Sequence, residues 1–457
     1  MHDLRRQALE SGKTVSRKAR SKQASPTSSR PSSQPPSRAA SRSRAVSRAG
    51  SEEDEAGNLS DETSFSTNSI DELLNGDASD PVTDAWRADL ADRIQELLDR
   101  KRSSVQGREK CLATYGRILT AQYAEEDIRG KEAELVLAFL KSIKAETSER
   151  ETILAIKALA MTVVTSPSDL IYEAVCGPLK RVISDSISVP TKVAAVHCLG
   201  TCTFFGGASD DEILDNMAYL LEIVASDGSF IDAQDEADPV VAALEEWGSL
   251  STLIDDLADE SEDAAEYFVD QLSSSDPGVQ IAAGENIALL YEKSYRPLTD
   301  DDSGTEFGGG DIIADPDDVP GVPKLVKNYD VYRRTDVLKD TLSDLASLNT
   351  RRLSKKEQKA IRTNFADILD SVEYPTHGPR YQNAISQDTG KRYGSRMTVR
   401  IHKEGVMKID KWWKLHRLQA LRRVLQSGFV KHYEANPIVF ESLPIMITND
   451  RKASKEY

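Results

Sequence analysis

The chain has 457 residues, of which 39% are apolar and only 6% aromatic, enough for two or three domains or one extended solenoid. It holds no run of 18 apolar residues and no apolar segment after the N-terminal charges, so we expect neither a membrane span nor a secretory signal. The net charge of −17 combines an acidic body with two basic ends, residues 1–50 and 379–457.

Residues 1–85 form a Ser/Arg-rich head that continues into an acidic segment. Neither part carries enough apolar surface to offset the entropy of ordering, so we predict disorder there. The acidic part contains a short apolar group, Ile70, Leu73 and Leu74. We interpret this group as part of a linker, with a docking motif or transient helix as the alternative.

Helical periodicity begins at Trp86 and continues to Tyr295, with short polar breaks that place Pro near first-turn positions. The four cysteines lie in apolar, helix-like runs without metal or disulfide spacing, which indicates small core residues in a reducing compartment. The predicted helices span residues 86–101, 106–121, 126–144, 149–164, 167–184, 189–203, 209–225, 238–254, 260–273 and 277–293.

Internal repetition indicates the architecture of this stretch. Each copy has small residues at its third and eighth positions and a large apolar residue at its seventh. The last small residues of successive copies are 40 to 48 residues apart, as in HEAT or armadillo repeats. We predict an all-α fold, an armadillo/HEAT-like α-solenoid over 86–295; an irregular helical domain is the alternative. The copies are ILAIKALA (153–160), VAAVHCLG (193–200), VAALEEWG (241–248), IAAGENIA (281–288) and, more weakly, EKCLATYG (109–116).

The repeats end before residues 296–330, which are acidic and rich in Gly, Pro and Asp and predict a flexible loop. Two closing helices follow within 331–375, at about 334–349 and 354–371. A basic group spans the start of the second, where Ser354 fits the helix start. The cations of this group are Arg351, Arg352, Lys355, Lys356, Lys359 and Arg362.

Residues 376–457 form a basic C-terminal module. Alternating apolar residues in 396–402 and 406–409 predict a small β-hairpin around a turn at 403–405. A helix is predicted over 411–426, with Asp410 as its cap and Gly428 as its stop. One apolar stripe runs along it: Leu415, Leu418, Leu421 and Leu425.

Basic and aromatic side chains alternate through this module, a composition suited to RNA because cations neutralise phosphates and rings stack on unpaired bases. The interleaved rings are Tyr381, Tyr393, Trp412 and Trp413, and packing of a tryptophan against the last repeat is the alternative. The acidic solenoid surface instead favours protein partners with basic patches. The candidate RNA-binding residues are Arg380, Lys391, Arg392, Arg400, Lys408, Lys411, Lys414, Arg417, Arg422, Arg423, Arg351, Arg352, Lys355 and Lys356, with Arg396 in the same run.

Catalytic patterns are missing from the sequence. The six histidines show no metal-ligand spacing, and His197 is interpreted as a satisfied core residue. FGGGD (307–311) lacks the Lys-Ser/Thr of a phosphate-binding loop. We therefore expect a protein that is not an enzyme and has no cofactor, metal or small-molecule substrate.

Three stretches resemble the interferon-related developmental regulator family. They are GVQIAAGENIALLYE (278–292), KKEQKAIRTNFADILDSVEYP (355–375) and MKIDKWWKLHRLQALRRVLQSGFVKHYEANPIVFESL (407–443). The resemblance covers about residues 86–445 and leaves out the Ser/Arg head. It implies an armadillo-like solenoid with a small C-terminal domain.

The resemblance also implies a function. Members associate with translationally inactive ribosomes and occupy tRNA and mRNA sites, so we expect a cytoplasmic silencer that contacts rRNA and ribosomal proteins. The alternative is a nuclear co-regulator of transcription linked to histone deacetylase complexes; an importin-type adaptor rests on architecture alone. In the family the chain continues past this point into a basic helix, whereas here it ends at Tyr457. We therefore expect the segment that enters the mRNA path to be missing or shortened.

Overall fold

A computed structural model describes residues 85–99, 103–297, 312–313, 325–348, 354–385, 387, 392–401 and 406–443. The predicted disordered head, the hairpin turn at 403–405 and the chain end at Tyr457 lie outside the described residues. The predicted RNA-binding residues Arg351, Arg352 and Lys391 lie outside them as well. These expectations therefore stay predictions.

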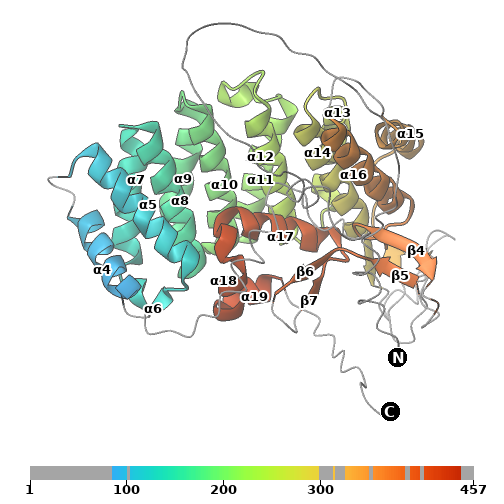
Figure 1. Ribbon diagram of the computed structural model, residues 1–457. Coiled ribbons are helices and arrows are strands. Elements are labelled where there is room, and N and C mark those ends of the chain that lie inside the picture. The colour runs from blue at the N-terminus through green and yellow to red at the C-terminus, as the bar shows by residue number, and fades with distance from the viewer. Residues whose placement is uncertain are drawn as a thin grey trace, which may run out of the picture. The chain divides into compact units, whose positions relative to one another are not determined.

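The fold is an α-solenoid built from packed helix pairs. The second helices of the pairs, α5, α8, α10, α12, α14 and α16, pack side by side and form what we call the inner row (Figure 1). The pairs are α4 (Ala85–Leu98) with α5 (Val105–Ala121), α7 (Glu132–Ala145) with α8 (Glu149–Thr165), α9 (Ile171–Asp185) with α10 (Val189–Phe205), α11 (Asp210–Ala225) with α12 (Ala237–Ser251), α13 (Ala258–Gln271) with α14 (Pro277–Lys293), and α15 (Thr335–Ala346) with α16 (Lys355–Glu373).

Local sequence explains where these helices begin and end. Side chains of Ser148 and Ser188 accept N–H bonds at the starts of α8 and α10, and Asp276 does so for α14. The single helix predicted over 126–144 is wrong. It is divided into α6 (Glu125–Ile128) and α7, because Gly130 adopts a left-handed φ of 80° between them.

The aligned third and seventh repeat positions lie in the core. The third-position alanines and the large seventh-position residues are fully buried, which confirms the repeat alignment. Two of the eighth-position glycines, Gly200 and Gly248, have specific neighbours. A Cβ on Gly200 would lie 2.0 Å from Glu246 Oε2, and one on Gly248 would lie 2.2 Å from Asn286 Oδ1. Glycine is thus required where a polar side chain of the next inner helix packs over the backbone.

Part of the segment predicted as a flexible acidic loop contains strands instead. β1 (Tyr295–Pro297), β3 (Leu325–Lys327) and β2 (Ile312–Ile313) form an antiparallel sheet in the order β1-β3-β2. Val326 is buried and the Asn328 N–H donates to the Ser294 carbonyl, so the sheet is anchored to the end of α14. The expectation of an unstructured stretch over all of 296–330 is therefore wrong at these residues.

The C-terminal module contains the predicted hairpin, β6 (Thr398–Arg400) paired with β7 (Val406–Lys408). A second hairpin, β4 (Tyr381–Ile385) with β5 (Arg392–Ser395), was not predicted, because its strands show no apolar alternation. Three helices follow, α17 (Trp412–Leu425), α18 (Phe429–Ala435) and α19 (Pro437–Ser442). The predicted leucine stripe of α17 is buried along its whole length.

The predicted bounds of the C-terminal helix, 411–426, agree with α17 to within one residue, but both predicted capping residues are wrong. Asp410 does not cap α17; its N-cap residue is Lys411, without a side-chain capping bond. Gly428 does not stop the helix in a left-handed conformation, since a short 3-10 turn, η4 (Gln426–Gly428), leads on into α18. Gly428 is small because a Cβ there would lie 1.7 Å from the carbonyl oxygen of Thr120 on α5.

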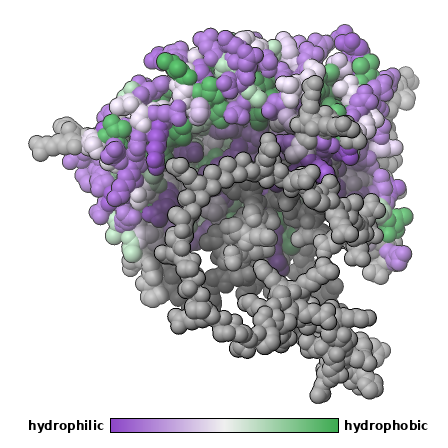
Figure 2. Space-filling view, turned by 45° about the horizontal axis from the view of Figure 1, so that its top comes forward, coloured by the Kyte–Doolittle hydropathy of each residue, from purple (hydrophilic) through white to green (hydrophobic). Residues whose placement is uncertain are grey.

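Hydrophilic residues dominate the coloured part of the face shown in Figure 2, and apolar residues are scattered across that part. The outer helices α11 and α13 begin with acidic first turns. This distribution agrees with carboxylates on solvated helix faces. Within the described ranges, no helix is both long enough and apolar enough to cross a bilayer.

Candidate RNA-binding surface

Helix α17 lies across the inner row and contacts α8, α12 and α14 (Figure 1). Its first turn is fixed from another helix, because the Glu292 carboxylate on α14 accepts the N–H groups of Trp412 and Trp413 at 2.8 and 3.2 Å. This contact provides the cap that the sequence assigned to Asp410. Burial raises the pKa of Glu292, opposed by the nearby charge of Lys411 and the two N–H bonds.

The rest of the segment continues along the inner row toward its N-terminal end. His432 Nε2 lies 2.7 Å from the carbonyl of Leu119 on α5, and Asn436 Nδ2 donates to the carbonyl of Val164 on α8 at 2.8 Å. Residues 411–443 thus form a strap, the name used below for α17, η4, α18 and α19. The strap covers part of the surface that the sequence left open to partners.

Arg423 is the central ion-pairing residue of the strap. Its guanidinium lies 2.7 Å from Glu246 and 3.4 Å from Glu245, both on α12. His197 Nδ1 on α10 also lies 2.8 Å from Glu246. Burial alone would raise the pKa of Glu246, but the charges of Arg423 and His197 hold it below its ordinary value. His197 is hydrogen-bonded as predicted, yet it is half-buried in this network and not in the core.

Arg417 makes an equally internal set of contacts. Its guanidinium donates to the side chain and carbonyl of Thr252 at 2.8 and 2.9 Å and to the carbonyl of Ser442 at 3.0 Å. It also lies over the rings of Phe204 and Trp413, 5.4 and 5.1 Å from their centroids. Arg417 and Arg423 therefore connect the strap to the solenoid, and we omit them from the RNA-binding surface.

Three other predicted cations have internal partners. Lys414 Nζ lies 2.6 Å from Asp410, and Lys411 Nζ donates to the carbonyl of Thr376 at 3.4 Å. Arg380 Nη1 lies 3.0 Å from Asp367 on α16. Arg422 is half-buried on α17. The basic and aromatic composition of the module therefore did not predict which of its cations reach solvent.

The exposed cations lie on two other parts of the chain. Arg392, Arg400 and Lys408 are exposed on the two hairpins, and Arg396 is exposed between them. Lys355 and Lys356 are exposed in the first turn of α16. The structure thus separates the predicted set into a group that fixes the strap and two exposed groups.

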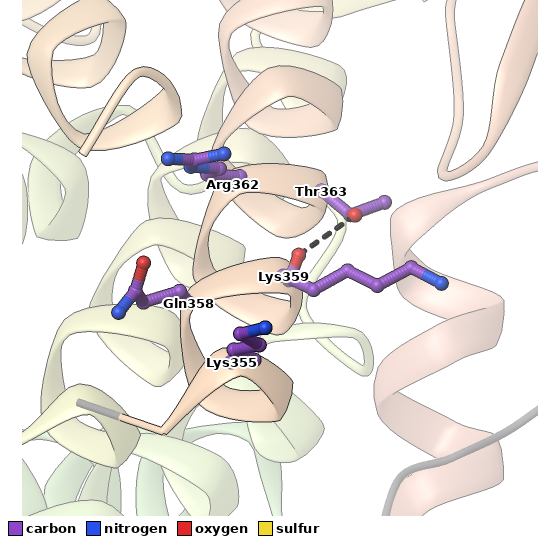
Figure 3. A pocket seen from close by; sticks show the side chains of 5 residues that line it. All are labelled: Lys355, Gln358, Lys359, Arg362 and Thr363. Carbon is purple, nitrogen blue, oxygen red and sulfur yellow. Dashed lines mark hydrogen bonds between the residues drawn. The ribbon is translucent and has the colours of Figure 1, made fainter. Parts of the chain in front are cut away.

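Lys355 lines an open depression of about 430 Å³ together with Gln358, Lys359, Arg362 and Thr363 of the same helix. Figure 3 shows that Gln358 and Arg362 extend to one side of the helix and Lys359 to the other. Arg362 Nε donates to the carbonyl of Leu348 at 2.7 Å, which anchors that side. The depression is shallow and basic, so it fits a phosphate group better than an apolar ligand.

Two functional residues of the strap contacts, Glu292 and Glu246, were not predicted. Glu246 is buried at the sixth position of the aligned repeat copy VAALEEWG, beside Glu245. The presence of a charged residue in this apolar run could have indicated a buried ion pair, because a buried charge requires a partner. Within the described ranges, no group of three or more His, Cys, Asp or Glu is placed to hold a metal ion.

The titration of Glu285 should make the stability of the fold depend on pH. Burial raises its pKa to about 7, against the hydrogen bond from Gln419 on the strap. Between pH 4.5 and about 7 the folded chain holds a proton that the unfolded chain has released, so stability falls as pH rises through this window. Replacing Glu285 by Gln should raise the free energy of unfolding at pH 8 by about 1–3 kcal/mol. Urea unfolding at pH 8 and pH 5 measures this.

The exposed Glu266→Gln on α13 is the matched control, since it makes the same chemical change without burial. It should leave stability within about 0.5 kcal/mol at both pH values. An equal effect of Glu285→Gln at pH 8 and pH 5 would contradict the titration.

Comparison with known proteins gives a consistent result over most of the chain. The family model "Interferon-related developmental regulator (IFRD)" matches residues 57–373. An uncharacterised protein of Schizosaccharomyces pombe is 26% identical over 83% of this chain and 81% of its own length. Interferon-related developmental regulator 1 of Homo sapiens and that of Mus musculus are each 23% identical over 79% of this chain and 73% of their own length.

Proposed function

We propose that this chain, which belongs to the interferon-related developmental regulator family, binds translationally inactive ribosomes and silences translation. In this proposal it acts by binding, without catalysis, in the cytoplasm. The exposed cations contact rRNA near the tRNA and mRNA sites, and ribosomal proteins with basic patches meet the acidic solenoid.

The observation that carries the proposal is the separation of charge. Arg392, Arg400 and Lys408 are exposed on short hairpins of a chain whose net charge is −17. Packing does not explain their number, since they contribute nothing to the core. A local group of cations on an acidic protein attracts the phosphates of RNA, while the acidic body repels RNA from the rest of the surface.

Reversing two of these charges tests the proposal. The double variant Arg400→Glu, Lys408→Glu should bind ribosomes at least about tenfold more weakly, and the slope of log affinity against log salt should fall by about two. Co-sedimentation with purified empty ribosomes across a salt series measures both quantities.

The control variant is Lys141→Glu, Lys144→Glu on α7, which makes the same change of charge at exposed positions away from the hairpins. It should bind as the unmodified chain does. Absence of the unmodified chain from ribosome fractions at modest salt would overturn the proposal.

A second candidate function is a nuclear scaffold for transcriptional co-regulation with histone deacetylase complexes. The observation that favours it is the Ser/Arg-rich sequence of residues 1–50, a composition that would suit a nuclear localisation or phosphorylation-switched segment. Proximity labelling in cells separates the two functions. Chromatin proteins without ribosomal proteins among the labelled neighbours would favour the second.

A further inference from the structure

We infer that the β4–β5 hairpin binds unpaired RNA, with Tyr393 as a stacking platform for a base. The inference rests on the proposed function, because it names the form of RNA that the hairpin cations meet. Four residues define this surface, which we call the hairpin platform: Tyr393, Arg392, Arg396 and Lys408.

The aromatic ring of Tyr393 lies on the surface of the hairpin, where its apolar area is exposed to water. Its side chain is 48% exposed, and Ile385 on the paired strand is 62% exposed, so the hairpin projects rings and apolar groups into solvent. The guanidinium of Arg396 lies 5.3 Å from the centroid of the Tyr393 ring and donates to Gln382 Oε1 at 3.1 Å. The ring is therefore held by a cation on one side, an arrangement that suits a base on the other.

The neighbouring hairpin brings a further cation, Lys408, close to the backbone of β5. A Cβ on Gly394, whose φ is 63°, would lie 3.5 Å from Lys408 Nζ and 3.9 Å from the Tyr381 ring. Lys408 of β7 therefore lies beside the backbone of β5, and the left-handed φ is what favours glycine at this position. The Arg396 N–H also donates to the carbonyl of Arg380, which extends the pairing of β4 with β5 by one residue and fixes the backbone that carries Arg396.

A stack of rings continues beside the platform. His377 lies 3.6 Å from Tyr381 with an angle of 9° between rings, and 5.0 Å from Tyr374. Tyr374 ends the stack and is 54% exposed. His377 itself is buried, hydrogen-bonded through Nδ1 to Asp370, and its Nε2 has no partner among the described residues. The stack ends in a second exposed ring, Tyr374, on which a base could stack.

Charge favours a nucleic acid over a protein. Among the described residues of 381–411, five are basic and only Asp410 is acidic, and Asp410 is paired with Lys414. Single strands expose base faces together with phosphates, whereas duplex RNA keeps its bases stacked inside. Exposed rings among cations therefore fit unpaired nucleotides. The basic residues are Arg392, Arg396, Arg400, Lys408 and Lys411.

The test compares fluorescein-labelled oligouridylate of about 12 nucleotides with a blunt RNA duplex of similar length, a length within the range that single-strand binders cover. Fluorescence anisotropy with the full chain should show tighter binding of the single strand. Tyr393→Ala should weaken single-strand binding about tenfold, and Tyr393→Phe should stay within about twofold. Tyr267→Ala is the control, because Tyr267 is a 38% exposed ring on α13 away from the cations.

Two results would overturn the inference: single-strand affinity unchanged in Tyr393→Ala, or duplex bound as tightly as the single strand by the unmodified chain. Ribosome co-sedimentation separates this from the proposed function. A chain that binds the oligonucleotide through Tyr393 but not ribosomes supports the inference and overturns the proposed function. A chain that co-sediments with ribosomes but prefers duplex RNA does the reverse.

Discussion

Replacing Arg423 by Leu should lower the free energy of unfolding by about 3–5 kcal/mol, because it leaves a buried carboxylate without its partner. Glu246 is 3% exposed and lies 2.7 Å from the Arg423 guanidinium, with His197 as its other hydrogen-bond partner. Urea unfolding followed by circular dichroism at pH 7.5 measures the loss. Hydrogen exchange should show faster opening of α17.

The pH dependence of this variant gives an independent check. In the unmodified chain the lowered pKa of Glu246 contributes stability above pH 4.5 that is lost as pH falls through the folded pKa. Without Arg423 that pKa rises, so the deficit of Arg423→Leu should shrink as pH falls and Glu246 takes up a proton. The exposed Arg181→Leu on α9 should cost less than about 0.5 kcal/mol. A deficit that is constant from pH 7.5 to pH 4 would contradict the ion-pair explanation.

Most of the solenoid could be predicted because its signals are local. Apolar spacing, first-turn prolines and repeat alignment depend on residues within one or two turns, and they correctly located α8, α10 and α14. The misses have physical reasons. Gly130 interrupts a continuous apolar pattern by adopting a left-handed φ, and β4–β5 pairs strands whose side chains are mostly exposed.

The candidate site was less predictable because a cation's role depends on distant partners. Arg417 and Arg423 were predicted to bind RNA together with Arg400, yet they contact Thr252 and Glu246, residues 165 and 177 positions away. No short-range pattern distinguishes a guanidinium that fixes a helix from one that meets a phosphate. Whether a guanidinium forms an internal ion pair depends on a buried partner, and burial of that partner depends on the tertiary fold.

The strap gives the acidic body a second role. Carboxylates of Glu292, Glu245 and Glu246 on the inner row hold the basic C-terminal segment, so part of the negative charge neutralises the chain's own cations. The two hairpins come directly before the strap in the chain, and Arg380, immediately before β4, is paired with Asp367 on α16. Fixing the strap thus fixes the position of the exposed cations, and loosening it should lower RNA affinity indirectly.

Trp412→Ala should lower the free energy of unfolding by about 3–5 kcal/mol, as for other large core truncations. The Trp412 side chain is only 2% exposed, and its Nε1–H donates to Ser371 on α16 at 2.7 Å. The sequence left Trp412 open as either a stacking ring or a core residue, and its burial favours the core. Urea unfolding measures the loss, and hydrogen exchange should show the strap opening more readily.

Three comparisons separate packing from ligand contact. Trp412→Phe keeps much of the ring volume but loses the bond to Ser371, so it should cost roughly half as much as Ala. Trp413 is half-buried beside Lys414 and Arg417, and its Ala variant should cost less than Trp412→Ala because less surface leaves the core. Tyr393→Ala should leave stability within about 0.5 kcal/mol while weakening single-strand binding. Unchanged stability in Trp412→Ala together with weakened RNA binding would reverse the assignment, because a ring that only packs cannot lose ligand affinity while the fold stays intact.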